Sequence, residues 1–309
     1  MPKDFISLAD WASDEIHELL GRAQQLRRLQ ADGQRPRTLE GRILAMYFEK
    51  PSLRTHVTFE AGIAQLGGHA VLLRPEQVGI GTRESPRDVA MNLSRWVDGL
   101  MARTFSHALV EQLAEEASIP VINGLTDYLH PCQAMADLQT IASLMPPGEA
   151  TLAYVGDGNN VANSLMLLAG KVGMSMRVAT PKSHPPAARV RRQAEQFAAE
   201  SGGEISWTED PHQAVKGADF VYTDTWTSMG QEEEAEERRR IFAEYQVNDA
   251  LLESAPKARV MHCLPAHRGE EITSELLDGE RSLIYEQAEN RLHAQKAIME
   301  RLMVGHRRG

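Results

Sequence analysis

The chain has 309 residues, with 33 Lys and Arg against 43 Asp and Glu, which gives a formal net charge of −10 at pH 7. With 42% hydrophobic and 25% charged residues, the composition is that of a globular protein rather than a disordered one. The acidic charge argues against a general nucleic-acid binder and against a protein of anionic membrane surfaces. Such a protein can still bind a small anion if its arginines gather locally.

Cysteine content and apolar runs indicate the compartment. Cys132 and Cys263 are the only cysteines, too few for a disulfide framework or a Cys-rich zinc site. Residues 1–5 show no signal-peptide pattern, and no apolar run approaches the roughly 18 residues of a membrane span. We therefore expect a soluble cytoplasmic protein without a membrane segment.

Helical and strand patterns alternate through the first half of the chain. Apolar residues at helical spacing follow Ser13, which can cap the first helix. Further on, strands are expected at 43–48, 69–73, 100–104 and 120–123, and helices at 55–66, 85–97 and 131–144. Pro146, Pro147 and Gly148 then form the clearest linker signal.

The alternation restarts after the linker, with strands expected at 152–155, 176–179, 205–208, 220–223 and 260–262, a helix at 160–172 and a last helix at 287–303. This pattern predicts an α/β fold of two doubly wound domains, each with a central parallel sheet, joined by long helices. The expected domains are 1–146, with 287–309 packing back on it, and 147–286. Ligands of such sheets bind beyond the carboxyl ends of the strands, so functional side chains are expected in the segments after the strands.

The segment after the strand at 43–48 suits an anion. Ser52, Arg54 and Thr55 flank the start of a helix, where N–H groups and the helix dipole favour a phosphate and arginine can bind it in bidentate fashion. The alternative is an ordinary N-cap beside a surface arginine. The glycines and the Gly-Lys-Ser/Thr of a P-loop are absent from this segment.

Arg103 and His130 also follow expected strands. Arg103 either binds a ligand or marks the point where a strand emerges into water. His130 precedes Pro131, which suits the first turn of a helix. The helix dipole there favours a neutral imidazole, which can donate a hydrogen bond to a carbonyl. A helix-capping histidine is the alternative.

Gly156 and Gly158 stand after a strand and before a helix, as in a dinucleotide-binding fingerprint. Val161 occupies the third glycine position, and the next strand ends at Thr180 without an acidic residue for a ribose. A nicotinamide-dependent dehydrogenase is therefore the weaker alternative. Asn159 and Asn160 can instead bind the polar end of a small substrate, although turn chemistry alone also explains such residues.

Two more strand ends carry reactive side chains. Asp224 can pair with a substrate amine, or can serve as an N-cap. The charged run at 232–240 is expected to be a solvated helical face with internal ion pairs. A metal site is one interpretation of His262, Cys263 and His267, but a fourth ligand is missing nearby in sequence. Alternatively, Cys263 can be a reactive thiol.

Together and in this order, these motifs resemble those of the aspartate/ornithine carbamoyltransferase superfamily, from about residue 5 to residue 305. The resemblance rests on Ser52-Leu53-Arg54-Thr55, Arg103, His130-Pro131-Cys132-Gln133, Asp224 to Gly230 and His262-Cys263-Leu264-Pro265. Three segments are similar to the ornithine branch of the family: Ser228-Met229-Gly230, the His-Cys-Leu-Pro segment and Glu289-Asn290-Arg291.

The resemblance implies transfer of the carbamoyl group of carbamoyl phosphate to the δ-amine of L-ornithine, giving L-citrulline and phosphate in arginine metabolism, biosynthetic or catabolic. It implies no cofactor and no metal, since the phosphate is already a good leaving group. Carbamoyl phosphate would be bound by Ser52, Leu53, Arg54, Thr55, Gln77, Arg103, His130, Gln133, Cys263, Leu264 and Arg291. Ornithine would be bound by Asn160, Asp224, Ser228 and Met229, and the catalytic residues would be Arg54, Arg103, His130, Asp224 and Cys263.

The family also implies domain closure on the substrates and a homotrimer or a multiple of trimers. Residues 77–84 suit a mobile loop, of which Gln77 or Arg83 would reach the neighbouring subunit's site. Two departures from the family pattern are Leu53, where threonine is usual, and His56, where arginine is common. A carbamoyltransferase that acts on putrescine, aspartate or an acylated ornithine is the closest alternative.

Overall fold

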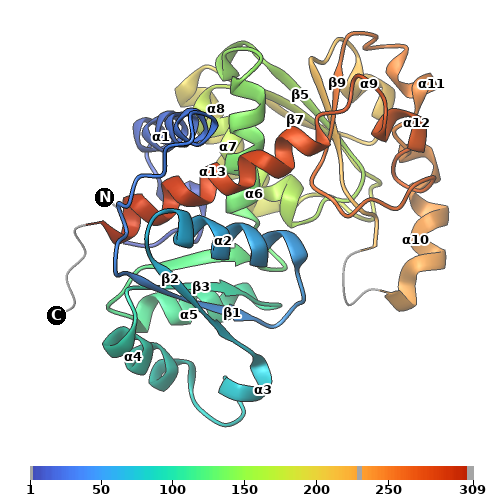
Figure 1. The fold of residues 1–309 in the computed structure, drawn as a ribbon. Helices are drawn as coiled ribbons and strands as arrows, with labels where there is room; N and C mark the ends of the chain where they lie inside the picture. The colour runs from blue at the N-terminus through green and yellow to red at the C-terminus, as the bar shows by residue number, and fades with distance from the viewer. Residues whose placement is uncertain (1–2, 228–231, 305–309) are drawn as a thin grey trace. The chain divides into compact units, whose positions relative to one another are not determined.

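The computed structural model describes residues 3–227 and 232–304. The chain forms two compact units: unit 1 is Met1–Gln139 with Glu289–Gly309, and unit 2 is Thr140–Ala288 (Figure 1). The chain crosses from one unit to the other within two helices, α6 (Pro131–Ala142) and α13 (Ile284–Met303).

Unit 1 contains, in its described residues, a four-stranded parallel sheet with the order β2-β1-β3-β4. Its strands are β1 (Ile43–Phe48), β2 (His69–Leu73), β3 (Gly99–Arg103) and β4 (Val121–Leu125). Phe48 pairs with Arg103, so β1 and β3 end level with each other. The strand order reverses between these two strands, which makes their carboxyl ends the expected binding position of the sheet.

Unit 1 also contains the helices α1 (Ser13–Ala31), α2 (Leu53–Gln65), α3 (Pro75–Val78), α4 (Pro86–Trp96) and α5 (His107–Glu116). Ala45 and Tyr47 belong to the same buried cluster as the apolar faces of α4 and α5. Side chains alternate between the faces of a strand, so Leu44 and Met46 point to the other face. Figure 1 shows α2 on that side of the sheet, opposite α4 and α5.

Unit 2 contains a five-stranded parallel sheet, again within the described residues, with the order β7-β6-β5-β8-β9. Its strands are β5 (Thr151–Val155), β6 (Ser175–Ala179), β7 (Ile205–Thr208), β8 (Phe220–Thr223) and β9 (Arg259–His262). Here the order reverses between β5 and β8. Its helices include α7 (Asn160–Val172), α8 (Ala188–Ser201), α9 (Pro211–Val215), α10 (Ala235–Phe242), α11 (Asp249–Leu252) and α12 (Ser274–Leu277).

The parallel sheets and flanking helices confirm the predicted fold class. Helix α2 begins two residues earlier than expected, because Ser52 rather than Thr55 caps it: Ser52 Oγ accepts the N–H of Thr55 at 3.2 Å. The last helix begins at Ile284, a turn earlier than predicted. Gln77 lies in the short helix α3 and not in a loop. None of the helices in the described part of the chain combines the length and apolarity of a membrane span.

One expectation about surface charge is wrong. The run at 232–240 does carry internal ion pairs, such as Arg239 with Glu236 at 2.6 Å, but Arg238 is buried and not solvated. Its guanidinium donates to the carboxylate of Asp157 and to the carbonyl of Trp226. An amphipathic helix needs one face inward, and here the buried face of α10 includes an arginine whose charge is paired.

Candidate active site

In unit 1, two guanidinium groups converge on one hydroxyl. Arg103 ends β3 and donates from Nη1 to Thr55 Oγ1 at 3.1 Å, and Arg291 of α13 donates from Nη2 to the same oxygen at 2.9 Å. All three residues are buried. Thr55 is held in place because it lies in the first turn of α2, just after the Ser52 cap. The fold therefore gathers positive charge at the point where the strand order of the sheet reverses.

Helix α6 supplies the next residues of this cluster. Arg291 Nη1 donates to Gln133 Oε1, and Gln133 Nε2 donates to the buried carboxylate of Asp137 at 2.8 Å. His130 is buried just before the helix, and its pKa lies well below the ordinary value. The main cause is burial, followed by the positive charges of Arg291 and Arg103, whereas the sequence suggested the helix dipole.

The start of α2 adds to the positively charged cluster of unit 1. Leu53 and Arg54 occupy its first two positions, where N–H groups point out of the helix end. Leu53 is 73% exposed and Arg54 is half-buried. A helix N-terminus together with arginines favours a bound anion, and a neutral histidine beside them can hydrogen-bond to a polarised carbonyl.

Gln77 does not join this cluster through its own contacts. It is exposed on α3, and its Oε1 accepts the N–H of Arg74 at 3.2 Å, so the side chain caps its own helix. Arg83 is also exposed, in the turn that follows. Ser228 and Met229 lie outside the described residues.

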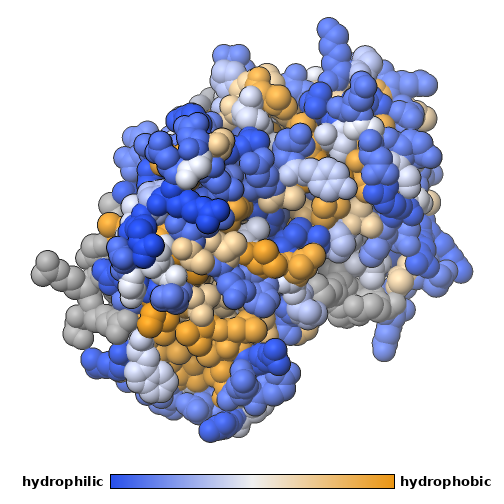
Figure 2. Space-filling view, in the orientation of Figure 1, coloured by the Kyte–Doolittle hydropathy of each residue, from blue (hydrophilic) through white to orange (hydrophobic). Residues whose placement is uncertain are grey.

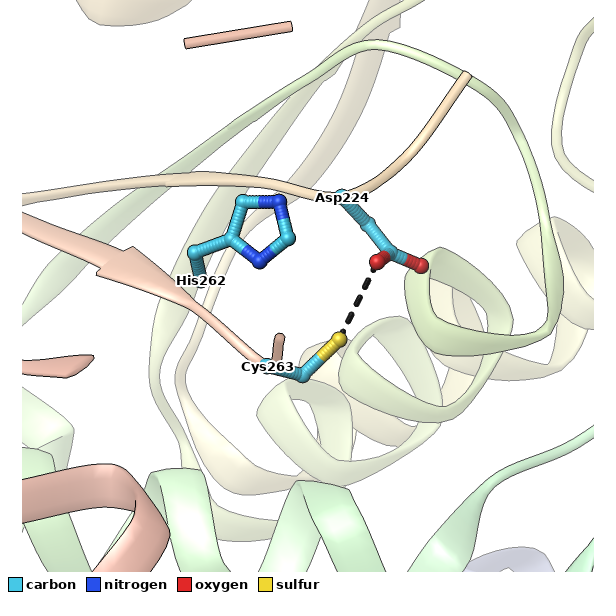
Figure 3. Close-up of side chains that lie close together, drawn as sticks. All are labelled: Asp224, His262 and Cys263. Atoms are coloured by element: carbon cyan, nitrogen blue, oxygen red, sulfur yellow. Dashed lines mark hydrogen bonds between the residues drawn. The ribbon is translucent and has the colours of Figure 1, made fainter. Parts of the chain in front are cut away.

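In unit 2, a carboxylate, a thiol and an amide form a compact network. Asp224 follows β8 and is buried, and its Oδ1 accepts from Cys263 Sγ at 3.1 Å (Figure 3). Its Oδ2 accepts from Asn159 Nδ2 at 2.8 Å. Asn159 also caps α7, because its Oδ1 accepts the N–H of Val161 at 2.9 Å. The cap thus fixes the amide that faces Asp224. Asn160 follows as the first residue of α7, half-buried.

His262 shapes the turn that carries Cys263 and Leu264. Its ring is fully buried, its Nδ1 accepts the N–H of Leu264 at 2.8 Å, and its Nε2 lies 3.1 Å from Glu271 Oε1. Possible ligand atoms of Asp224, His262 and Cys263 lie within 4.8 Å of one another (Figure 3). A metal at this position would have to displace a hydrogen bond of His262, since both ring nitrogens are already engaged.

Close packing accounts for Gly158 without a dinucleotide. A Cβ on Gly158 would lie 2.3 Å from the backbone carbon of Pro185, closer than atoms can approach. The N–H of Gly158 also donates to the carbonyl of His184 at 3.1 Å. The glycine is therefore required by the crossing of two chain segments, which removes the main support for a nicotinamide site.

The two cysteines have different environments. Cys132 is fully buried, its Sγ donates to the carbonyl of Asn123 at 3.3 Å, and burial raises its pKa to about 12. Cys132 is therefore a neutral packing residue within α6. Cys263 is partly exposed and faces Asp224.

Sequence reasoning missed Asp137 and Glu271, and it considered Asn159 for substrate binding but not for its contact with Asp224. Asn159 carried a signal, because asparagine before an apolar helix is a common N-cap. Asp137 lies four residues after Gln133 in the same helix, a spacing that brings side chains together. Glu271 carried no signal, since its partner His262 meets it only through the fold.

The comparisons with known proteins agree with this geometry. Residues 3–143 match the family model described as aspartate/ornithine carbamoyltransferase, carbamoyl-P binding domain, and residues 148–302 match its Asp/Orn binding domain. The chain is 53% identical over 303 residues to the ornithine carbamoyltransferase of Anoxybacillus flavithermus, covering 97% of this chain and 96% of that protein. It is 50% identical over 305 residues to the anabolic ornithine carbamoyltransferase of Pyrococcus furiosus, covering 98% and 97%. A solved structure of ornithine carbamoyltransferase from Pyrococcus furiosus superposes with a TM-score of 0.96, at 49% identity and 98% coverage of each chain.

Proposed function

The chain belongs to the aspartate/ornithine carbamoyltransferase family, and on that premise we propose that it transfers the carbamoyl group of carbamoyl phosphate to the δ-amine of L-ornithine. The products are L-citrulline and phosphate. The observation that carries the proposal is the convergence of Arg103 and Arg291 on Thr55, in the unit that matches the carbamoyl-P binding model. The relative from Pyrococcus furiosus that is named as anabolic favours a step of arginine biosynthesis.

The cationic cluster of unit 1 binds carbamoyl phosphate in this proposal. The phosphate group lies at the N-terminus of α2, against the N–H groups that follow Ser52 and against Arg54, which stabilise it as it departs. Arg103 and neutral His130 polarise the carbamoyl carbonyl, while Arg291 and Gln133 hold the cluster together. Contacts of Gln77, Cys263 and Leu264 with carbamoyl phosphate stay predictions.

The network of unit 2 binds ornithine and removes its proton. An alkyl ammonium has a pKa near 10.4 and cannot attack, so a proton must leave first. In this proposal the ammonium group of ornithine gives that proton to Cys263 Sγ. At the same time the thiol gives its own proton to Asp224 Oδ1, along the hydrogen bond of 3.1 Å. The neutral amine then attacks the carbamoyl carbon, the C–O bond to phosphate breaks with its electron pair, and the attacking nitrogen releases its surplus proton to phosphate.

Assembly and location extend the proposal. We expect a homotrimer or a multiple of trimers, supported by apolar surface on unit 1: β2 is an edge strand, Val71 is 44% exposed, and Figure 2 shows apolar side chains gathered over β2. Light scattering after gel filtration should give a multiple of three times the 34.3 kDa chain mass. The cytoplasmic location stays a prediction.

Turnover with a panel of amines tests the function directly. The purified protein is incubated with carbamoyl phosphate and, separately, with ornithine, putrescine, aspartate or an N-acylated ornithine, and the carbamoylated product is quantified. We expect kcat/KM for ornithine to exceed the others by at least 10²-fold, because a site that hydrogen-bonds a substrate group strongly rejects substrates without it. Equal or faster turnover of another amine would reassign the substrate.

A further inference from the structure

We propose that Glu271 is a positioning residue for the turn 263–267: it holds the turn at both ends and so presents the Cys263 thiol to Asp224. Glu271 touches neither proposed substrate group and acts through His262 and the backbone. The inference rests on the proposed function for its kinetic consequence, but its structural content is independent of the substrate.

The first end of the turn is held through His262. A backbone N–H can be accepted only by an unprotonated ring nitrogen, so the hydrogen bond from Leu264 to Nδ1 assigns the imidazole proton to Nε2. Nε2 then donates to Glu271 Oε1 at 3.1 Å. Both side chains are fully buried, so water does not compete for these bonds. The carboxylate thus sets the tautomer that the turn requires.

The second end is held by the same oxygen. Glu271 Oε1 also accepts the backbone N–H of His267 at 2.6 Å. One buried carboxylate therefore ties the residue before the turn to the last residue of the turn.

The conformation of the turn shows why it needs such support. Leu264 has φ of +58°, in the left-handed region, which is uncommon for a residue other than glycine, asparagine or aspartate and persists only where the surroundings impose it. Cys263 precedes Leu264, and its thiol meets Asp224 from the neighbouring strand end (Figure 3). If the support is removed, Leu264 relaxes to negative φ and the thiol leaves Asp224.

Thiol alkylation tests the inference without using the substrate. Cys132 is buried, so iodoacetamide reports on Cys263, and mass spectrometry assigns the modified peptide. We expect Glu271→Ala to raise the alkylation rate at Cys263 at least fivefold. Glu271→Gln should stay within twofold of the wild type, because its amide oxygen can accept both N–H groups. Glu270→Gln is the matched control, since this neighbour pairs with Arg239 at 2.9 Å and reaches the turn only at the exposed ring of His267, at 3.9 Å; the alkylation rate of this variant should not change.

Kinetics and stability then separate positioning from a general effect on folding. Glu271→Ala should lower kcat/KM for ornithine about 30-fold, and Glu271→Gln should restore it to within threefold. If the alanine variant does not fold, Glu271→Leu fills the site without an acceptor and gives the same test. An alanine or leucine variant with wild-type alkylation and kinetics overturns the inference, as does a loss of thermal stability with unchanged alkylation. A wild-type protein that makes no citrulline refutes the proposed function alone, because the alkylation comparison still decides the role of Glu271.

Discussion

The clusters of the two units occupy the same position in the same kind of sheet and have opposite chemical character. Each lies at the carboxyl ends of two strands where the order of a parallel sheet reverses. In unit 1 guanidinium groups meet on Thr55, and in unit 2 a carboxylate, a thiol and an amide meet around Asp224. The architecture therefore gives each cluster its position, and the side chains at the strand ends give it the charge that suits an anion in unit 1 and an amine in unit 2.

Hydrogen bonds orient the charged groups of both clusters. In unit 1 Arg103 and Arg291 both donate to the hydroxyl of Thr55, and Arg291 also donates to Gln133, so these bonds orient the two guanidinium groups without neutralising them. In unit 2 the carboxylate of Asp224 accepts two hydrogen bonds, which orient it without neutralising it. The first arrangement suits charge stabilisation, and the second suits positioning and proton transfer.

The largest effect is expected when a positive charge is removed from the cationic cluster of unit 1. Arg103→Ala should lower kcat/KM for carbamoyl phosphate by about 10²–10³-fold, the usual cost of removing one donor to a developing oxyanion. Citrulline formation at varied carbamoyl phosphate measures it. Arg37→Ala is the control, because this arginine has a 65% exposed side chain that pairs with Glu40. A loss below tenfold in the Arg103 variant would contradict its role.

The corresponding change in unit 2 is Asp224→Asn, which keeps shape but removes the charge. We expect kcat/KM for ornithine to fall about 10²-fold, within the range of acid–base contributions. Asp219→Asn is the control: Asp219 precedes the same strand at its other end, where it accepts the N–H of Thr151 at 2.9 Å. The proposal fails if the Asp224 variant keeps full turnover.

The two cysteines allow a direct comparison of the units. Cys263→Ala should lower kcat about tenfold or more with little change in thermal stability, because its thiol is partly exposed and lies in the proposed proton path. Cys132→Ala should do the reverse, costing about 1 kcal/mol of stability through a small cavity with kcat unchanged. Initial rates and thermal melting of both variants decide this, and equal kinetic effects would refute the distinction.

The smallest effect concerns the pH dependence of stability. His130 has a pKa well below the ordinary value in the folded protein, while the unfolded chain titrates near 6.5. The contribution of neutral His130 to the free energy of unfolding is therefore fully present above pH 6.5. This contribution is lost as the pH falls below 6.5, by at most about 1.4 kcal/mol per pH unit. The difference in melting temperature between the wild type and His130→Asn should become smaller as the pH falls from 7.5 to 5. A difference independent of pH would show that His130 is not held neutral.

Residues next to a strand or helix end were predictable, and residues that act across the fold were not. Arg54, Arg103 and Asp224 became candidates because each follows an apolar run, and Asn160 because it begins a helix. Arg238 was misjudged, since its neighbours are exposed charges and only the approach of Asp157 and Trp226 explains its burial. Gly158 was misjudged for the same reason. Its sequence pattern suggested a ligand-binding loop, whereas in the structure the glycine allows close packing against Pro185.

The sequence by itself determined the alternation of helices and strands, the two parallel sheets and the positions of the polar residues at strand ends, because hydrophobic periodicity and turn residues act locally. Only the tertiary structure decided that Arg291 reaches Thr55 from 236 residues away and that Glu271 holds His262. It also decided that burial, rather than a helix end, is the main cause of the low pKa of His130. The physical reason is that hydrogen bonds and desolvation depend on which segments meet, and sequence spacing does not encode those meetings.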